Sequence, residues 1–185
     1  MNDEASSSSV TGLVELHRKG KISVGITTVS ASENLKGSRE FPGSARHFRE
    51  RISQCQWDDL DLVLGPAVKS LSFIGLSKIV GAGFEAERSE LWQAMFPNIE
   101  CSPPKGVTEE ELWSATHKKW RNAWCDVHTI WAHIDAGRDV FVTANERDFQ
   151  HNFEKLQMLG LKKVATPAEA LLLANEPPHG NRSRD

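Results

Sequence analysis

Residues 139–149 read Asp-Val-Phe-Val-Thr-Ala-Asn-Glu-Arg-Asp-Phe, and this stretch decides the fold. A short apolar run at 140–142 stops at a cluster of polar and acidic residues, a pattern typical of a buried strand. Helical patterns precede the strand at 121–136 and follow it at 148–159. Because strands that alternate with helices build parallel sheets, the sequence predicts an α/β fold with a parallel central sheet.

The same alternation extends over much of the chain. The hydrophobic patterns further predict one helix that begins near Ser9 and three more at 45–56, 84–96 and 168–174. They also predict strands at 22–29, 60–64 and 161–164. We therefore expect a single domain at residues 1–174, with an irregular helical insertion at about 66–118. Residues 175–185 are polar and are predicted to form a disordered tail.

Local signals mark several helix ends. Thr166 is placed as an N-cap, with Pro167 at the first helical position and Glu169 at the third. Thr108 and Glu111 have the same capping-box spacing. These pairs predict helix starts just after residues 108 and 166.

The helix predicted at 121–136 has one apolar stripe and stops at Gly137. The stripe consists of residues that recur at three- and four-residue steps: Trp120, Trp124, Val127, Trp131 and Ile134. Asp126 lies off this stripe, so its carboxylate is available for a polar site.

Composition narrows the classes of function. The 185 residues carry a formal net charge of −3, so a nucleic acid would have to be held by local basic patches. Cys55, Cys101 and Cys125 are widely spaced, match no zinc pattern and suggest reduced, buried thiols. No run approaches the roughly 18 apolar residues of a membrane span. We therefore expect a cytoplasmic protein with no membrane partner.

Oxygen-bearing side chains occur where a parallel α/β fold exposes its chemistry. Glu33 follows the first predicted strand, and Asp126 projects near the start of its helix. Asn145, Glu146 and Asp148 follow the strand of the opening stretch. Ligands of open parallel sheets gather at the carboxyl ends of strands, and such oxygens suit Mg²⁺ or Mn²⁺. Divalent ions of this kind activate water and stabilise charge on a phosphodiester.

Each of these residues also has a plainer interpretation. Glu33 and Asp126 lie near helix starts, where a carboxylate complements the helix dipole. Asp148 precedes an apolar helix and fits an ordinary N-cap. The spacing alone leaves both interpretations open.

A basic and aromatic cluster gives a second candidate site. Lys118, Lys119 and Arg121 adjoin Trp120 and Trp124, and could grip RNA through phosphate contact and base stacking. The alternative is a solvated basic face that covers a tryptophan core, and we favour it.

The order of these features resembles the PIN-domain nucleases. In the C-terminal third, the matching segments are 125–132, 139–149, 159–161 and 166–171. They correspond to an acid on a helix, a strand that ends in Thr with Asn two residues on, and a final strand that leads to a Thr-Pro-acid helix. The segment 13–33 is also similar to the family, since a helix and a Gly-Lys-Ile turn lead into a strand that a Glu follows.

The resemblance implies a three-layer α/β/α PIN-like fold and an Mg²⁺- or Mn²⁺-dependent ribonuclease, a hydrolase often found as the toxin of a toxin–antitoxin pair. Glu33 matches the second acid of the family and Asp126 the third. Asn145 matches the position after the strand, and Asp148 is the nearby acid. Glu33, Asp126 and Asp148 would then be the metal ligands, and Asn145 would complete the shell of catalytic residues. RNA is the implied substrate, and an antitoxin protein or a second copy of the chain is a further candidate partner.

The family's opening strand, which ends in an aspartate, has no counterpart in residues 1–8. We therefore expect a truncated or late-started PIN-like protein, whose sheet lacks a central strand and whose metal site lacks one ligand. The alternative function is a catalytically impaired PIN-like module that binds RNA or protein. A third reading is an unrelated α/β protein whose acidic residues are helix caps.

Overall fold

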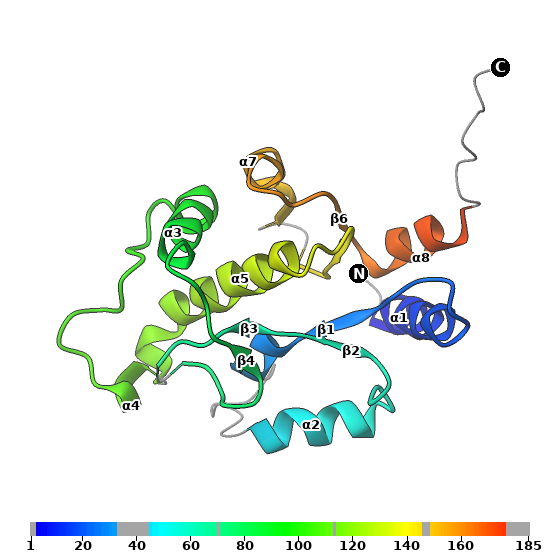
Figure 1. Cartoon of the computed structure of the whole chain (residues 1–185), viewed down its shortest axis with the longest axis horizontal. Coiled ribbons are helices and arrows are strands. Elements are labelled where there is room, and N and C mark those ends of the chain that lie inside the picture. Colours follow the sequence, from blue (N-terminus) through cyan, green and yellow to red (C-terminus); the bar gives the residue numbers. More distant parts are fainter. Residues whose placement is uncertain (1–2, 33–44, 70, 113, 146–148, 177–185) are drawn as a thin grey trace.

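The computed structural model describes residues 3–32, 45–69, 71–112, 114–145 and 149–176. Helices and short parallel strands make up this part of the chain, so it has a mixed α/β architecture (Figure 1). Among the residues described, no helix is both long and apolar enough to cross a membrane.

The described strands form three separate parallel pairs. In the first, β1 (Gly25–Thr27) pairs with β2 (Asp61–Val63), with Gly25 opposite Asp61. The other pairs join β3 (Gly65–Pro66) to β4 (Ser77–Lys78) and β5 (Phe141–Val142) to β6 (Val164–Ala165). The predicted parallel pairing is confirmed, but the pairs are not joined into one central sheet within the described residues.

The strand predicted at 22–29 is shorter than expected because hydroxyl groups bind the backbone at its end. The Ser30 Oγ donates to the Thr27 carbonyl at 2.7 Å, and the Val29 N–H donates to the Thr27 Oγ1 at 3.3 Å. Such local bonds compete with strand pairing. The chain therefore turns into a 3₁₀ helix, η1 (Thr28–Ser32).

The long helix α5 (Lys118–Asp135) is the central element of the core. Helix α3 (Phe84–Met95) packs on one side of it, and β1, β3 and η1 contact it elsewhere (Figure 1). The tryptophans of the predicted apolar stripe are buried: Trp120, Trp124 and Trp131. Gly137 follows the helix with φ +65°, which confirms the predicted stop.

The helices α2 (Ala45–Gln54) and α7 (Phe153–Met158) lie within the ranges predicted for them. Phe48 and Ile52 of α2 pack on Ile26 of β1 and on Leu76, so α2 covers the side of these strands away from α5 (Figure 1). Helices thus lie on both sides of β1.

The first and last helices of the described chain pack together. Helix α1 (Asp3–Arg18) lies beside α8 (Pro167–Asn175), and Gly12 allows the close approach, since a Cβ at that position would lie 3.0 Å from Leu171 (Figure 1). The start of α1 lies before the predicted start near Ser9. The predicted tail at 175–185 begins inside α8 at Asn175, and residues 177–185 lie outside the described part.

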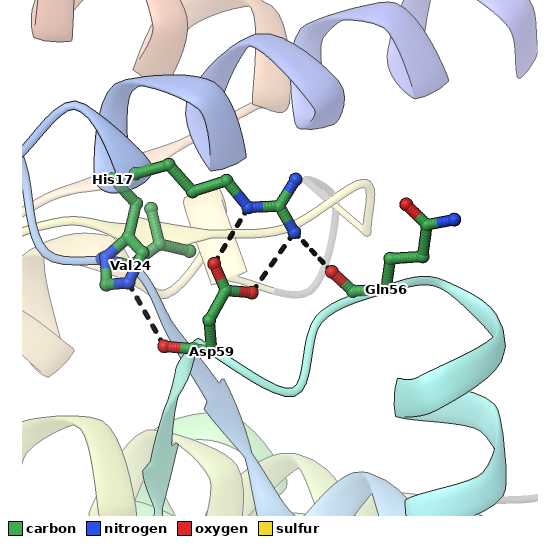
Figure 2. A network of polar contacts seen from close by, with 5 residues as sticks. His17, Val24, Gln56 and Asp59 are labelled. Atoms are coloured by element: carbon green, nitrogen blue, oxygen red, sulfur yellow. Dashed lines mark hydrogen bonds and ion pairs between the residues drawn. The ribbon is translucent and has the colours of Figure 1, made fainter.

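A polar network joins the end of α1 to the connection between α2 and β2 (Figure 2). Arg18 contacts both carboxylate oxygens of Asp59, at 2.8 and 3.1 Å, and also donates to the Gln56 carbonyl. His17 accepts from the Val24 N–H at 3.1 Å, and its other ring nitrogen lies 3.3 Å from the Asp59 carbonyl. The Arg18 guanidinium holds the pKa of the Asp59 carboxyl below its usual value.

The segment predicted as a helical insertion at 66–118 contains β4, α3, a short helix α4 (Glu109–Leu112) and a 3₁₀ turn η2 (Ala115–His117). The predicted capping box is present: the Thr108 N–H donates to the Glu111 carboxylate at 2.8 Å, and the Glu111 N–H donates to the Thr108 Oγ1 at 3.3 Å. This segment supplies α3, the main partner of α5.

In the basic and aromatic cluster around Trp120, the two tryptophans and Arg121 are buried, whereas Lys118 and Lys119 are exposed. Arg121 is only 2% exposed and donates to the carbonyls of Leu112 and Ser114, at 3.0 and 3.1 Å. Trp120 and Trp124 are both buried. The tryptophan-core interpretation is therefore confirmed, although Arg121 belongs to the interior and not to a solvated face.

Candidate functional site

One face of α5 carries a stripe of polar side chains. Lys119, Asn122, Asp126 and Thr129 recur at three- and four-residue steps, so they project in the same direction. All four line a hollow of about 500 Å³. Exposure falls along the stripe, from Lys119 and Asn122 on the surface, through Asp126, to the buried Thr129.

The end of β5 forms the facing polar wall of this hollow. Thr143 and Asn145 both line it, and the Asn145 N–H donates to the Thr143 Oγ1 at 3.0 Å. The Thr143 N–H in turn donates to the Ala165 carbonyl of β6 at 3.0 Å, which fixes the start of this loop. The structure therefore brings together Asp126 and Asn145, two of the four predicted catalytic residues.

Aromatic rings complete the hollow. Phe141 and Phe149 line it with their ring centroids 5.0 Å apart, and Phe96 and Ile99, which follow α3, also line it. An apolar wall of this kind lowers the local dielectric and strengthens polar contacts made inside the hollow.

Among the described residues, two buried polar atoms in or next to this hollow have no hydrogen-bond partner. One is the Thr129 Oγ1, and the other is the Nε2 of His133, one turn further along α5. Burial lowers the pKa of His133 to about 4, so its imidazole is neutral at pH 7. The His133 ring packs edge-on against Phe141, with centroids 5.4 Å apart.

The remaining predicted site residues, Glu33 and Asp148, lie outside the described residues, as does Glu146. Ser32, which directly precedes Glu33 in the sequence, is held against α5. Its carbonyl accepts from the Cys125 thiol at 3.6 Å, and its Oγ donates to the Leu71 carbonyl at 2.8 Å. The end of η1 therefore lies beside Cys125, the neighbour of Asp126.

The prediction of buried thiols holds for Cys125 but not for all three cysteines. Cys125 is buried and Cys101 is half-buried, but Cys55 is exposed, so the prediction is wrong for Cys55.

The types of side chain around the hollow suit a hard cation. A carboxylate, two amides and two hydroxyls present oxygen atoms from both walls: Asp126, Asn122, Asn145, Thr129 and Thr143. Within the described part of the chain, no three His, Cys, Asp or Glu residues are grouped as a metal site, and Asp126 is the only carboxylate that lines the hollow.

Sequence reasoning missed three polar residues of the hollow, Asn122, Thr129 and Thr143, and it placed Lys119 in a separate basic cluster. Helical periodicity could have found Lys119, Asn122 and Thr129, because they lie seven and four residues before Asp126 and three after it. Thr143 was part of the quoted strand end, but its role in fixing Asn145 depends on a contact that spacing does not reveal.

No protein-family model, curated protein or solved structure matches the chain in comparisons with known proteins.

Proposed function

We propose that this hollow is the active site of a metal-dependent endoribonuclease that hydrolyses RNA phosphodiester bonds. One observation carries the proposal: Asp126 and Asn145, which were predicted from separate segments, line the same hollow. Parallel strands with helices on both sides are consistent with a three-layer PIN-like fold, in which the strand pairs would belong to one sheet.

The start of β5 is tied to the starts of β1 and β2, which favours such a common sheet. Arg138, three residues before β5, donates to the Ser23 Oγ at 2.7 Å and to the Asp61 carboxylate at 3.0 Å. This ion pair holds the pKa of Asp61 below its ordinary value.

In the proposed mechanism, Asp126 would hold an Mg²⁺ or Mn²⁺ ion with Asn145, and Glu33 and Asp148 would supply further carboxylates. When bound, such an ion stabilises the charge on the phosphoryl oxygens and lowers the pKa of a bound water. Lys119 at the rim would neutralise the charge of the RNA backbone. The aromatic wall would exclude bulk water from the reacting phosphate.

A thermal-shift titration with Mn²⁺ tests the metal site. Millimolar Mn²⁺ should raise the melting temperature of the wild-type chain, since a ligand that binds only the folded state stabilises it. Asp126→Asn should abolish the shift, and Glu90→Gln, an exposed carboxylate on α3, should keep it. An equal shift in the wild type and Asp126→Asn would show that the ion binds elsewhere.

Cleavage of a single-stranded RNA tests the activity itself. The wild-type chain should cleave in Mn²⁺ and not in EDTA, and Asp126→Asn should lower the rate at least about 100-fold, because the proposed ion would lose its carboxylate. Glu90→Gln should cleave at the wild-type rate. Cleavage that survives in EDTA would contradict a metal-dependent mechanism.

A non-cleaving RNA- or protein-binding module is the second candidate, and it is favoured by the single carboxylate among the described lining residues. RNA binding in EDTA without cleavage in Mn²⁺ would support it. A cytoplasmic location and an antitoxin or second copy as protein partner follow only from the sequence and the family resemblance, and they remain part of the proposal.

A further inference from the structure

The inner end of the hollow has groups that metal binding at Asp126 does not use. Thr129 lies one helical turn from Asp126 and is only 6% exposed, and within the described part of the chain its Oγ1 has no hydrogen-bond partner. Buried hydroxyls in folded proteins are normally hydrogen-bonded, because leaving one unpaired is penalised. The unpartnered Thr129 hydroxyl therefore indicates a polar ligand at this depth.

The wall near this end contains an aromatic ring, because Phe141 lines the hollow and contacts His133, one turn beyond Thr129 on α5. Phe141 is half-buried and is held between Phe149 and His133, with centroid separations of 5.0 and 5.4 Å. Its ring is therefore positioned before any ligand arrives, and little conformational entropy would be lost on stacking. A ligand with a flat apolar face and a polar edge fits this combination of ring and hydroxyl.

The outer end of the stripe offers different chemistry. Asn122 presents an amide that both donates and accepts hydrogen bonds, and Lys119 adds a cation one turn further out. Read from the inside outward, α5 therefore presents a hydroxyl, a carboxylate, an amide and an ammonium group. A hollow of about 500 Å³ lies within the size range of small-ligand sites.

We propose that the inner end of this hollow holds one unstacked base of a single-stranded RNA. The base edge would meet Thr129, its face would stack on Phe141, and the adjoining sugar and phosphate would extend past Asn122 toward Lys119. The identity of the ligand as RNA rests on the proposed function, and the pocket adds how one nucleotide of that RNA is held.

The test uses a short single-stranded RNA in which each base in turn is replaced by an abasic site. Affinity for the full chain is measured by fluorescence anisotropy in EDTA, so that cleavage does not occur. One abasic position should lower the affinity of the wild type about tenfold or more, because base stacking and edge contacts are lost together. The other positions should have much smaller effects.

Thr129→Val tests whether the effect of the abasic position arises from a base held in this pocket. Valine has the shape of threonine and removes an unpartnered hydroxyl, so the variant should fold at least as well as the wild type. It should bind the intact RNA about tenfold more weakly and lose much of its sensitivity to the critical abasic position. Thr11→Val, an exposed threonine on α1, should leave every affinity unchanged. Asn122→Ala, at an exposed helix position where folding is not in question, should weaken the binding of intact and abasic RNA by the same factor, because Asn122 would meet the sugar and phosphate and not the base.

The outcomes separate the two proposals. Metal-dependent cleavage with no position-specific abasic effect would overturn the base pocket and leave the nuclease proposal standing. A position-specific effect that Thr129→Val removes, without cleavage, would support the pocket and overturn the nuclease. No RNA binding would overturn both, and an abasic effect of equal size in the wild type and Thr129→Val would overturn the pocket.

Discussion

Gly137 shows how a single residue sets the end of a central helix. Its φ of +65° is left-handed, and a Cβ added there would meet nothing within 4 Å. Gly137→Ala should therefore lower the free energy of unfolding by about 1 kcal/mol through backbone strain alone. Urea denaturation measures this change.

Gly81→Ala is the matched control for Gly137→Ala. A Cβ at Gly81 also meets open space, but the residue does not have a left-handed φ. Its stability should change by less than about 0.5 kcal/mol. Equal losses in the two variants would show that backbone strain at residue 137 is not the cause.

Individual residues at two places in the chain also show why some sequence predictions failed. The strand at 22–29 ended early because the Thr27 and Ser30 hydroxyls bind backbone groups, and β propensity does not include such local bonds. Arg121 was assigned to a basic surface because its neighbours in the sequence are charged. The carbonyls to which Arg121 donates belong to residues 112 and 114, and the sequence pattern does not show that the chain folds back to place them beside it.

At the scale of elements, α8 depends on its N-terminal cap. The Thr166 Oγ1 accepts from the Glu169 N–H at 3.2 Å, and the Glu169 carboxylate accepts from the Thr166 N–H at 2.8 Å. Thr166→Ala should cost about 1 kcal/mol of stability, since the Glu169 N–H loses its partner. The change is measured as a shift in the urea midpoint.

Thr166→Ser keeps the hydroxyl and should retain most of that stability. A loss in Thr166→Ser as large as in Thr166→Ala would assign the effect to the lost methyl group and not to the cap. The sequence predicted this cap correctly because all its partners lie within four residues of one another.

The elements that build the site were predictable to different degrees. The helix that carries Asp126 and the strand that precedes Asn145 follow from local hydrophobic patterns, and both are present. The aromatic wall was not predicted, because Phe96 follows α3 and reaches the hollow only through the packing of α3 on α5. Contacts between distant elements leave no periodic signal in the sequence.

At the scale of the whole molecule, two buried histidines should make stability depend on pH. Burial lowers the pKa of His128 to about 3 and that of His133 to about 4 in the folded chain. The unfolded chain titrates near 6.5 and so binds more protons in acid. Stability is therefore complete above about pH 6.5 and is lost as the pH falls toward 4 and 3.

Each histidine should contribute up to about 1.4 kcal/mol per pH unit over this range. Urea denaturation at pH 7, 6 and 5 measures the slope. His128→Asn should reduce the slope of the free energy of unfolding against pH by about the contribution of one histidine, whatever the stability of the variant at pH 7. His151→Asn, at an exposed position, is the control and should leave the slope unchanged. A slope that His128→Asn does not alter would contradict a buried neutral imidazole at that position.

The arrangement of the strand pairs was only partly predictable at this scale. The alternation of strands and helices correctly indicated parallel pairing. Whether the β1–β2 and β5–β6 pairs form one sheet depends on long-range packing between β1 and β5. The sequences of these two short strands do not predict that packing. The alternation also predicted one parallel sheet, and within the described residues the three pairs are not joined.

The packing of α1 on α8 has a consequence for synthesis on the ribosome. Leu13 of α1 is covered by a cluster that includes Ala165 and Ala170, which are added roughly 150 residues later. At a translation rate of about 5–20 residues per second, α1 leaves the ribosome on the order of ten to thirty seconds before α8 can pack on it. During that interval its apolar face is open to chaperones, and it is covered only after α8 has been synthesised.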